Sequence, residues 1–195
     1  MNLLQRVTAW AHALMRRWHL MNDQFLYFAY GSNMCTGRLR DRVPSASFVR
    51  IGYVAQRSLR FHKRSTTDGS GKCDAFRTAN PNDELWGVMF LINMNEKSDL
   101  DEAEGLGRGY DEENLSVQSD RGMVQALAYV AAPRSIVPTL QPYSWYRDFV
   151  LAGAQEHQLS AAYIEAIQAV QTSEDPDQAR AARERRLLPP WYRAP

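Results

Sequence analysis

The chain has 195 residues, of which 45% are hydrophobic, 23% charged and 11% aromatic, as in an ordinary globular protein. This length suits one compact domain with its own core and is short for two. The formal net charge of +1 provides no overall field that would attract nucleic acid or an anionic membrane. The arginines of residues 180–186 are interrupted by Glu184 and by alanines, so we interpret this local cluster as a solvated helix face.

The two cysteines, Cys35 and Cys73, cannot form a disulfide framework and lack the CxxC spacing of a zinc or redox site. Two free thiols indicate a cytoplasmic protein. Cys35 lies close to a Gly-Ser turn and is a candidate nucleophile. A catalytic cysteine needs a base, however, and none of the four histidines stands in a recognisable arrangement with it.

Residues 1–24 are predicted to form an amphipathic helical extension, with Trp10, Leu14, Met15 and Trp18 on one face. The segment lacks the cleavage site of a secretory signal, and no stretch reaches the ~20 apolar residues of a membrane span. We expect it to pack on the domain or on a partner, which gives a reason to expect a homodimer. A membrane-surface helix is the alternative. A third possibility is that Met21 is the true start.

Residues 25–170 are predicted to form the folded domain, whose first part is rich in strands. The apolar run 25–30 ends at Gly31, which is typical of a buried strand entering a tight turn. A short helix with Thr36 as N-cap is predicted at 36–41. Further strands are predicted at 47–54, 58–63, 74–79 and 85–92, with a polar loop at 65–71.

The second part of the domain changes to a helical period. A helix is predicted at 95–104, capped by Asn95, with Leu100 and Ala103 facing inward and Gly105 at its end. Strands at 111–118 and 123–130 follow, then helices over 143–170 with a break near Ser160. Residues 171–195 form a charged, Pro-ending tail that we expect to be loosely held. Strands first and long helices last favour an α+β fold.

The turn 30–33, with the sequence Tyr-Gly-Ser-Asn, is the first candidate functional element. A strand that runs into such a turn just before a helix exposes successive backbone N–H groups, which can hold a carboxylate or a developing oxyanion. Gly31 permits close approach and an unusual φ angle, while Ser32 and Asn33 add donors. A purely structural turn is the alternative. The phosphate-loop and dinucleotide-binding patterns are absent from the sequence.

The acidic run 99–104 contains the candidate acid–base. Asp99, Asp101 and Glu102 are expected to face water. Glu104 lies in the last helical turn before Gly105, at the negative end of the helix dipole. This position and partial burial both disfavour the ionised carboxylate, which suits a general acid–base.

Several segments, in this order, resemble the γ-glutamylcyclotransferase family, and together they span residues 25–170. They are Tyr-Phe-Ala-Tyr-Gly-Ser-Asn-Met at 27–34, Trp-Gly-Val at 86–88, Leu-Asp-Glu-Ala-Glu-Gly at 100–105 with Tyr110 beyond it, and a C-terminal set comprising Tyr146, Gly153, Ala154, Leu159 and Tyr163. The resemblance implies an α+β fold, a small mixed β-barrel with surrounding helices and a cavity at one end.

The resemblance also implies the site residues. Glu104 would be catalytic, and the turn residues Tyr30, Gly31, Ser32 and Asn33 would bind the substrate. Tyr110 and Tyr146 occupy positions where the family places tyrosines near the site, although packing in the core is an equal alternative for both.

The implied reaction cyclises a small γ-glutamyl molecule. Glu104 takes a proton from the α-amine, whose nitrogen attacks the γ-carbonyl, and the proton then passes to the leaving amine as 5-oxoproline forms. Donors of the turn 30–33 stabilise the charge on oxygen, and the intramolecular geometry supplies much of the acceleration. No metal, cofactor or covalent intermediate is required by this chemistry.

Residues 69–77 depart from the pattern of the animal enzymes and look more like a bacterial branch. If their strand lines the cavity, Arg77 can bind a substrate carboxylate; the alternative is a surface arginine paired with Asp83 or Glu84. The departure leaves the substrate open among γ-glutamyl amino acids, glutathione, γ-glutamyl-ε-lysine and carrier-linked groups. A non-catalytic binding module, or a pathway enzyme that trims a larger intermediate, are the alternative functions.

Overall fold

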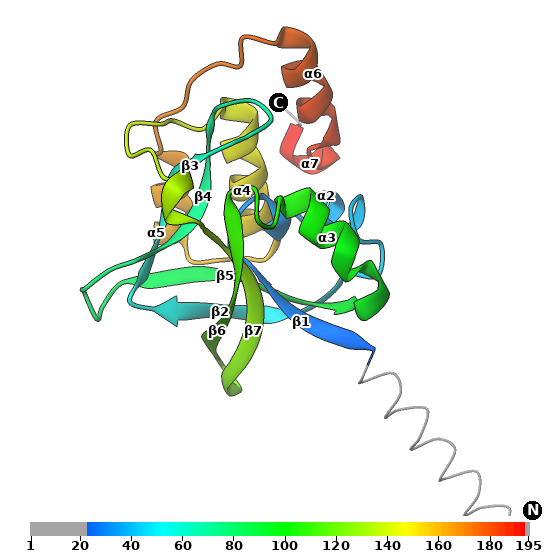
Figure 1. Cartoon of the computed structure of the whole chain (residues 1–195), viewed down its shortest axis with the longest axis vertical. Coiled ribbons are helices and arrows are strands. Elements are labelled where there is room, and N and C mark those ends of the chain that lie inside the picture. Colours follow the sequence, from blue (N-terminus) through cyan, green and yellow to red (C-terminus); the bar gives the residue numbers. More distant parts are fainter. Residues whose placement is uncertain (1–22, 194–195) are drawn as a thin grey trace, which may run out of the picture.

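The fold is a closed five-stranded barrel with a two-stranded sheet beside it (Figure 1), in a computed structural model that describes residues 23–193. The barrel order is β1-β5-β2-β6-β7. Only β1 and β7 pair in parallel, so the barrel is mixed, as predicted. The strands are β1 (Gln24–Ala29), β2 (Ser47–Ala55), β3 (Arg57–Arg64), β4 (Gly71–Arg77), β5 (Glu84–Asn93), β6 (Tyr110–Ser119) and β7 (Gly122–Ala131).

Helices surround one end of this barrel, and α6 and α7 lie at the top of the view (Figure 1). The α-helices are α2 (Thr36–Arg40), α3 (Lys97–Glu104), α4 (Ser144–Glu156), α5 (Ala161–Gln168), α6 (Gln178–Leu187) and α7 (Pro190–Arg193), with 3-10 turns η1 (Ser32–Met34), η2 (Met94–Glu96) and η3 (Pro133–Ser135). Within residues 23–193, none of the helices has the length and apolar character needed to cross a membrane. The helix predicted over 1–24 lies outside the described residues, except that Gln24 already belongs to β1.

Strand β5 is the centre of the core because both of its faces are covered. It pairs with β1 on one side and β2 on the other, and residues 87–90 are all buried. A continuous apolar run is the pattern expected of such a strand. Phe28 of β1, Phe90 of β5 and Phe149 of α4 are fully buried, so the same core joins the barrel to α4.

Helix α3 ends as predicted but begins differently. Gly105 takes the left-handed conformation with φ 72° and ends the helix. Asn95 is not its cap, because residues 94–96 form the turn η2 and α3 starts after Glu96. Ala103 is exposed and Asp101 is half-buried, its carboxylate accepting a 2.6 Å hydrogen bond from the hydroxyl of Tyr129. The face of α3 that meets the barrel is therefore partly acidic, which an apolar period cannot reveal.

For the starts of two other helices, α2 and α5, one prediction is wrong and one is confirmed. Thr36 is the first residue of α2, and the N-cap position belongs to Cys35, which makes no capping bond through its side chain. The predicted break before α5 is confirmed, because the side chain of Ser160 accepts a hydrogen bond from the N–H of Tyr163.

The C-terminal tail is not loosely held over its described part, contrary to the prediction. Asp175 is fully buried and accepts hydrogen bonds from the indole of Trp145 at 2.9 Å and from Arg180 at 2.7 and 2.5 Å. These bonds hold the pKa of Asp175 near 2, well below its usual value. The interpretation of Arg180 as a solvated residue is therefore wrong, and α6 is fixed against the start of α4.

Helix α4 positions the turn after β1 through a glycine. A Cβ at Gly153 would lie 2.4 Å from the backbone nitrogen of Cys35 and 2.5 Å from the carbonyl carbon of Met34. Real side chains do not pack at such distances, so only glycine lets the helix contact the backbone of this turn. The packing of α4 thus determines where the end of η1 lies.

Gly153→Ala is expected to lower the free energy of unfolding by about 1–3 kcal/mol, because the added methyl group overpacks against backbone. Urea denaturation measures the change. Gly37→Ala is the matched control, since a Cβ at Gly37 in α2 meets no heavy atom within 4 Å. That substitution should be neutral or stabilise by about 0.5–1 kcal/mol. Equal stability changes in the two variants would contradict the packing argument.

Candidate active site

Residues of the turn 30–33, α3, β6 and α4 meet at one end of the barrel and line two adjoining spaces. The outer cavity, of about 370 Å³, lies between the β3–β4 loop, the end of α3, the start of α4 and α6. The inner chamber, of about 20 Å³, reaches into the barrel end. Ser32, Glu104, Tyr110 and Tyr146 line both spaces and so mark their junction.

The carboxylate of Glu104 is held at this junction by two donors. Its Oε1 accepts hydrogen bonds from the Nδ2 of Asn33 at 2.5 Å and from Arg42 at 3.2 Å. The Nδ2 of Asn33 also donates to the hydroxyl of Tyr27 at 3.1 Å, and its Oδ1 accepts from Arg42 at 2.8 Å. The side chain of Glu104 remains 16% exposed. The guanidinium of Arg42 therefore places a positive charge against this carboxylate.

The turn 30–33 presents backbone donors beside this carboxylate. The N–H of Met34 donates to the carbonyl of Gly31 at 2.9 Å and closes the turn η1. The N–H groups of Ser32 and Asn33 precede that bond and have no acceptor within residues 23–193. Gly31 has an ordinary φ of −116°, so the unusual angle predicted for it is wrong. A Cβ at Gly31 would lie 3.0 Å from the Cβ of Cys73, so a side chain there would require this packing to give by a few tenths of an ångström.

Tyrosines make up half of the residues that line the inner chamber. They are Tyr27, Tyr30, Tyr110, Tyr129 and Tyr146. Burial raises the pKa of all five above the ordinary value of 10, so their hydroxyls stay neutral. The hydroxyl of Tyr110 donates to the carbonyl of Cys73 at 2.5 Å, and that of Tyr146 accepts from the N–H of Cys73 at 3.2 Å. These tyrosines shape the chamber and present fixed dipoles, and they do not accept protons.

The outer cavity carries an excess of positive charge. Its cationic lining residues are Arg38, Arg42, Lys63, Lys72, Arg108, Arg180 and Arg183, and its acidic ones are Asp68, Glu102, Glu104 and Glu184. Such a cavity concentrates anionic small molecules.

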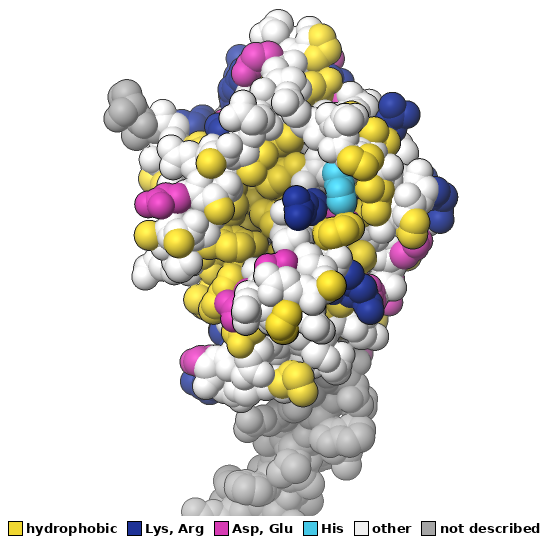
Figure 2. Space-filling model, turned by 90° about the vertical axis from the view of Figure 1, so that its left-hand side faces the viewer, with side chains coloured by type: hydrophobic (Ala, Val, Ile, Leu, Met, Phe, Trp, Pro, Cys, Tyr) yellow, Lys and Arg dark blue, Asp and Glu magenta, His cyan; other side chains and the backbone are white. Residues whose placement is uncertain are grey.

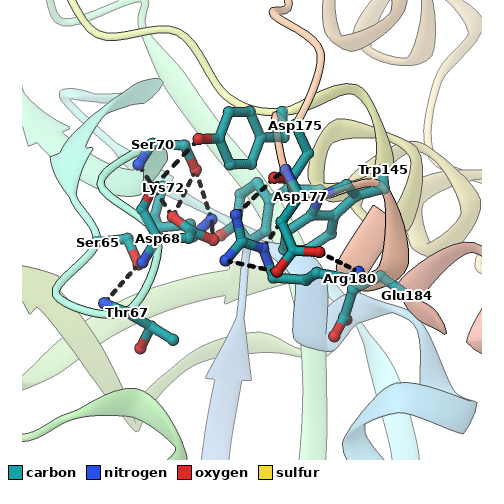
Figure 3. A network of polar contacts seen from close by, with 12 residues as sticks. Ser65, Thr67, Asp68, Ser70, Lys72, Trp145, Asp175, Asp177, Arg180 and Glu184 are labelled. Carbon is teal, nitrogen blue, oxygen red and sulfur yellow. Dashed lines mark hydrogen bonds and ion pairs between the residues drawn. The ribbon is translucent and has the colours of Figure 1, made fainter. Parts of the chain in front are cut away.

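A polar network joins the β3–β4 loop to α4 and α6 along the wall of this cavity (Figure 3). Lys72 pairs with Asp68 at 2.8 Å, and its ammonium lies 4.8 Å from the ring centre of Trp145. The indole of Trp145 in turn donates to Asp175. The wall is therefore rigid although three separate segments build it.

Arg77 does not belong to this site, so the prediction that it lines the cavity is wrong. Its side chain is 77% exposed and pairs with Glu113 at 2.7 Å. Glu113 also pairs with Arg57, so the predicted partners Asp83 and Glu84 are replaced by a residue from β6. Strand β4 is buried at Cys73 and Ala75, and its last two residues are exposed where it leaves the core.

Sequence reasoning missed several residues of the site, namely Tyr27, Arg42, Lys63, Lys72, Cys73 and Tyr129. Tyr27 and Tyr129 lie in strands that were predicted correctly. Their place in the site could not be predicted, because the sequence does not show that barrel closure brings these strands together. Arg42 is 62 positions from Glu104 in the sequence, and no local pattern joins them.

A second hollow lies on the face that carries β3, β4 and α5 and is mainly apolar (Figure 2). Its volume is about 560 Å³, and its described lining includes Leu59, Phe61, Ile136 and Leu140. No carboxylate is among the described residues that line it. The polar cavity at Glu104 is the better site for acid–base chemistry.

Comparisons with known proteins agree with this fold. A model of the AIG2-like family matches residues 84–167. Human gamma-glutamylcyclotransferase is 32% identical over 158 residues, which cover 78% of this chain and 81% of the human protein, and the mouse protein matches equally well. A solved structure of a gamma-glutamyl cyclotransferase superimposes with a TM-score of 0.72 at 27% identity, covering 83% of this chain and 99% of the other. The chain belongs to the gamma-glutamylcyclotransferase family.

Proposed function

We propose that the chain cyclises a γ-glutamyl amide, releasing 5-oxoproline and a free amine, with Glu104 as general base and then general acid. The observation that carries this proposal is the position of the Glu104 carboxylate. It lies at the junction of the two spaces, held by Asn33 and Arg42, beside a turn whose N–H groups at Ser32 and Asn33 have no acceptor within residues 23–193. A proton acceptor and oxyanion donors close together are what amide cyclisation needs.

The inner chamber determines how a substrate sits. Its volume of about 20 Å³ has room for roughly one water molecule, so it cannot hold a whole γ-glutamyl group. The γ-carbonyl therefore lies at the junction, with its oxygen toward the N–H groups of Ser32 and Asn33. The leaving amine then extends into the outer cavity.

Glu104 relays protons from the α-nitrogen to the leaving nitrogen. It takes one proton from the α-ammonium group, and the freed nitrogen forms a bond to the γ-carbon. The ring nitrogen then loses its second proton, and the bond from the γ-carbon to the leaving nitrogen breaks as Glu104 passes a proton to that nitrogen. The released amine takes up the other proton, so the α-nitrogen loses two protons and the leaving nitrogen gains two. Arg42 restores the charge balance whenever Glu104 is ionised, because its guanidinium stays within 3.2 Å. Holding the amine against its own carbonyl supplies much of the rate.

The size and charge of the outer cavity support a small anionic substrate. Its volume of about 370 Å³ is at the low end of the range for small-molecule sites, about 300–1,000 Å³. A reaction in the cytoplasm agrees with the two unpaired cysteines. The homodimer inferred from residues 1–24 stays a prediction.

Glu104→Gln is expected to fold and to lower kcat by about 10²–10⁴-fold, because the amide cannot accept a proton. Release of 5-oxoproline from γ-glutamyl substrates measures the loss. Asp99→Asn is the matched control, an exposed carboxylate on the same helix that lines neither space. Near-normal turnover by Glu104→Gln would sink the assignment.

A substrate panel separates this function from its alternatives. Release only from a bulky γ-glutamyl intermediate would indicate the pathway enzyme. Binding without release from any member of the panel would indicate a non-catalytic module.

A cysteine mechanism makes a different prediction about thiol chemistry. Cys35 is buried and lines neither space, while Cys73 lines the inner chamber and is 2% exposed. Burial raises the pKa of the Cys73 thiol to about 12. Since the thiolate is the reactive form, neither residue suits a nucleophile.

We therefore expect iodoacetamide to leave both thiols of the folded protein unlabelled at about pH 9, where an ordinary thiol with a pKa of about 8.5 is largely ionised. Mass spectrometry counts the labels, and the same treatment in urea should label both cysteines. Rapid labelling of Cys73 in the folded protein, with loss of activity, would revive the cysteine mechanism.

A further inference from the structure

Lys63 is a buried cation that faces the outer cavity without a counter-ion. Only 5% of the residue is exposed, and its ammonium lies 4.3 Å from the ring centre of Tyr110. Within residues 23–193 this ammonium has no ion pair and no hydrogen bond. Tyr110 lines both the outer cavity and the inner chamber, so Lys63 stands close to their junction.

The other well-buried cations of the cavity are all neutralised within the protein. Arg38 pairs with Glu184 at 3.0 Å, Arg42 with Glu104 at 3.2 Å, Lys72 with Asp68 at 2.8 Å and Arg180 with Asp175 at 2.5 Å. Arg108 and Arg183 are largely exposed to water. A buried charge is costly unless it is paired. Among the described residues, Lys63 is therefore the buried cation of this cavity that can pair with an anionic group of a ligand.

The nearby carboxylates do not fill this role. Glu104 and Asp68 act on Lys63 only at longer range, and burial outweighs them and lowers the pKa of the ammonium. Glu104 is already bonded to Asn33 and Arg42. Asp68 is already bonded to Lys72 and Ser70.

The position of the ammonium is built into the backbone. Lys63 pairs with Lys72 across the β3–β4 sheet and forms a bridge to Ile136 on its other side. Gly109, with φ 140°, leaves the space that the side chain occupies. A Cβ there would lie 2.8 Å from the Cε of Lys63 and 3.1 Å from its Nζ. Few side chains adopt that φ, so glycine serves both the turn and the lysine.

We propose that Lys63 is a specificity-determining residue that binds a carboxylate on the leaving amine of the substrate. The inference rests on the proposed function, because that function places the γ-carbonyl at the junction and the leaving amine in the outer cavity. The substrates favoured by this arrangement are γ-glutamyl amino acids or peptides with a free carboxylate close to the scissile amide. A γ-glutamyl derivative of an amine that carries no carboxylate lacks the group that Lys63 recognises.

The test compares γ-glutamyl-alanine with γ-glutamyl-alaninamide, which differ only in the leaving-group carboxylate. Lys63→Met keeps the apolar stem and removes the charge. It should raise KM for the acid about tenfold or more, as expected for a lost charged hydrogen bond, with little change in kcat. KM for the amide should stay nearly unchanged. Lys63→Arg should retain part of the preference for the acid.

Arg64→Met is the control, because it removes the same charge from the next residue of β3, whose side chain is exposed and lines neither space. It should behave as the wild type does toward both substrates. Equal rises in KM for the acid and the amide in Lys63→Met would overturn the proposal. The lysine would then bind the α-carboxylate of the γ-glutamyl group, which both compounds share, or support the fold. A fall in kcat for both, with a displaced pH profile, would also overturn it.

Failure of the proposed function is distinguishable from failure of this inference. If the wild-type protein releases 5-oxoproline from neither compound, the proposed function fails for this substrate class. Calorimetric titration of the same two compounds then measures binding directly. Tighter binding of the acid that is lost in Lys63→Met would support the carboxylate site, and equal binding of both compounds to the wild type would refute it.

Discussion

The buried amide of Asn33 holds the site together. Its side chain joins Tyr27 of β1, Arg42 beyond α2 and Glu104 at the end of α3, three segments that no backbone pairing connects at this point. A side-chain amide supplies both the donors that Tyr27 and Glu104 accept and the acceptor that Arg42 needs. An aspartate would place a like charge against Glu104, and an apolar side chain would leave buried polar groups without partners. The backbone N–H of the same residue has no acceptor within residues 23–193, so the turn 30–33 both holds the carboxylate of Glu104 and presents N–H donors beside it.

The position of the turn 30–33 depends on the two elements that pack against it, α4 and β4. Gly153 lets α4 lie directly against the backbone of Met34 and Cys35, and Gly31 lets the turn contact Cys73 of β4. The contact at Gly153 is too close for a Cβ, and the contact at Gly31 is tight for one. The turn 30–33 is therefore packed closely between α4 and β4, and we expect a side chain at Gly153 to move its N–H groups relative to Glu104.

The sequence contained enough information for the barrel and for the centre of the site. Strand periodicity located all seven strands, because β5 and its neighbours have apolar faces that a single chain displays. Glu104 stood out because Gly105 ends its helix directly behind it. Arg42 and Tyr129 did not stand out, because their roles exist only after barrel closure brings distant segments together. Arg77 was misplaced for the same reason, since the partner of a charged residue depends on tertiary structure.

The junction and the outer cavity are built from different kinds of segment. For this reason the sequence alone points to a type of reaction but leaves the substrate open. The junction is built from short local motifs, the turn 30–33 and the end of α3, whose chemistry follows from their residue types. The outer cavity is built from a hairpin loop and from α6, joined by Asp68, Lys72, Trp145, Asp175 and Arg180. Nearly every charge in that wall is cancelled by a neighbour, so counting charges in the sequence says little about the ligand. The charge that is available to a ligand is the one without a partner. Within residues 23–193 the buried ammonium of Lys63 is in this position, because the nearby carboxylates of Glu104 and Asp68 already have other partners in the folded chain.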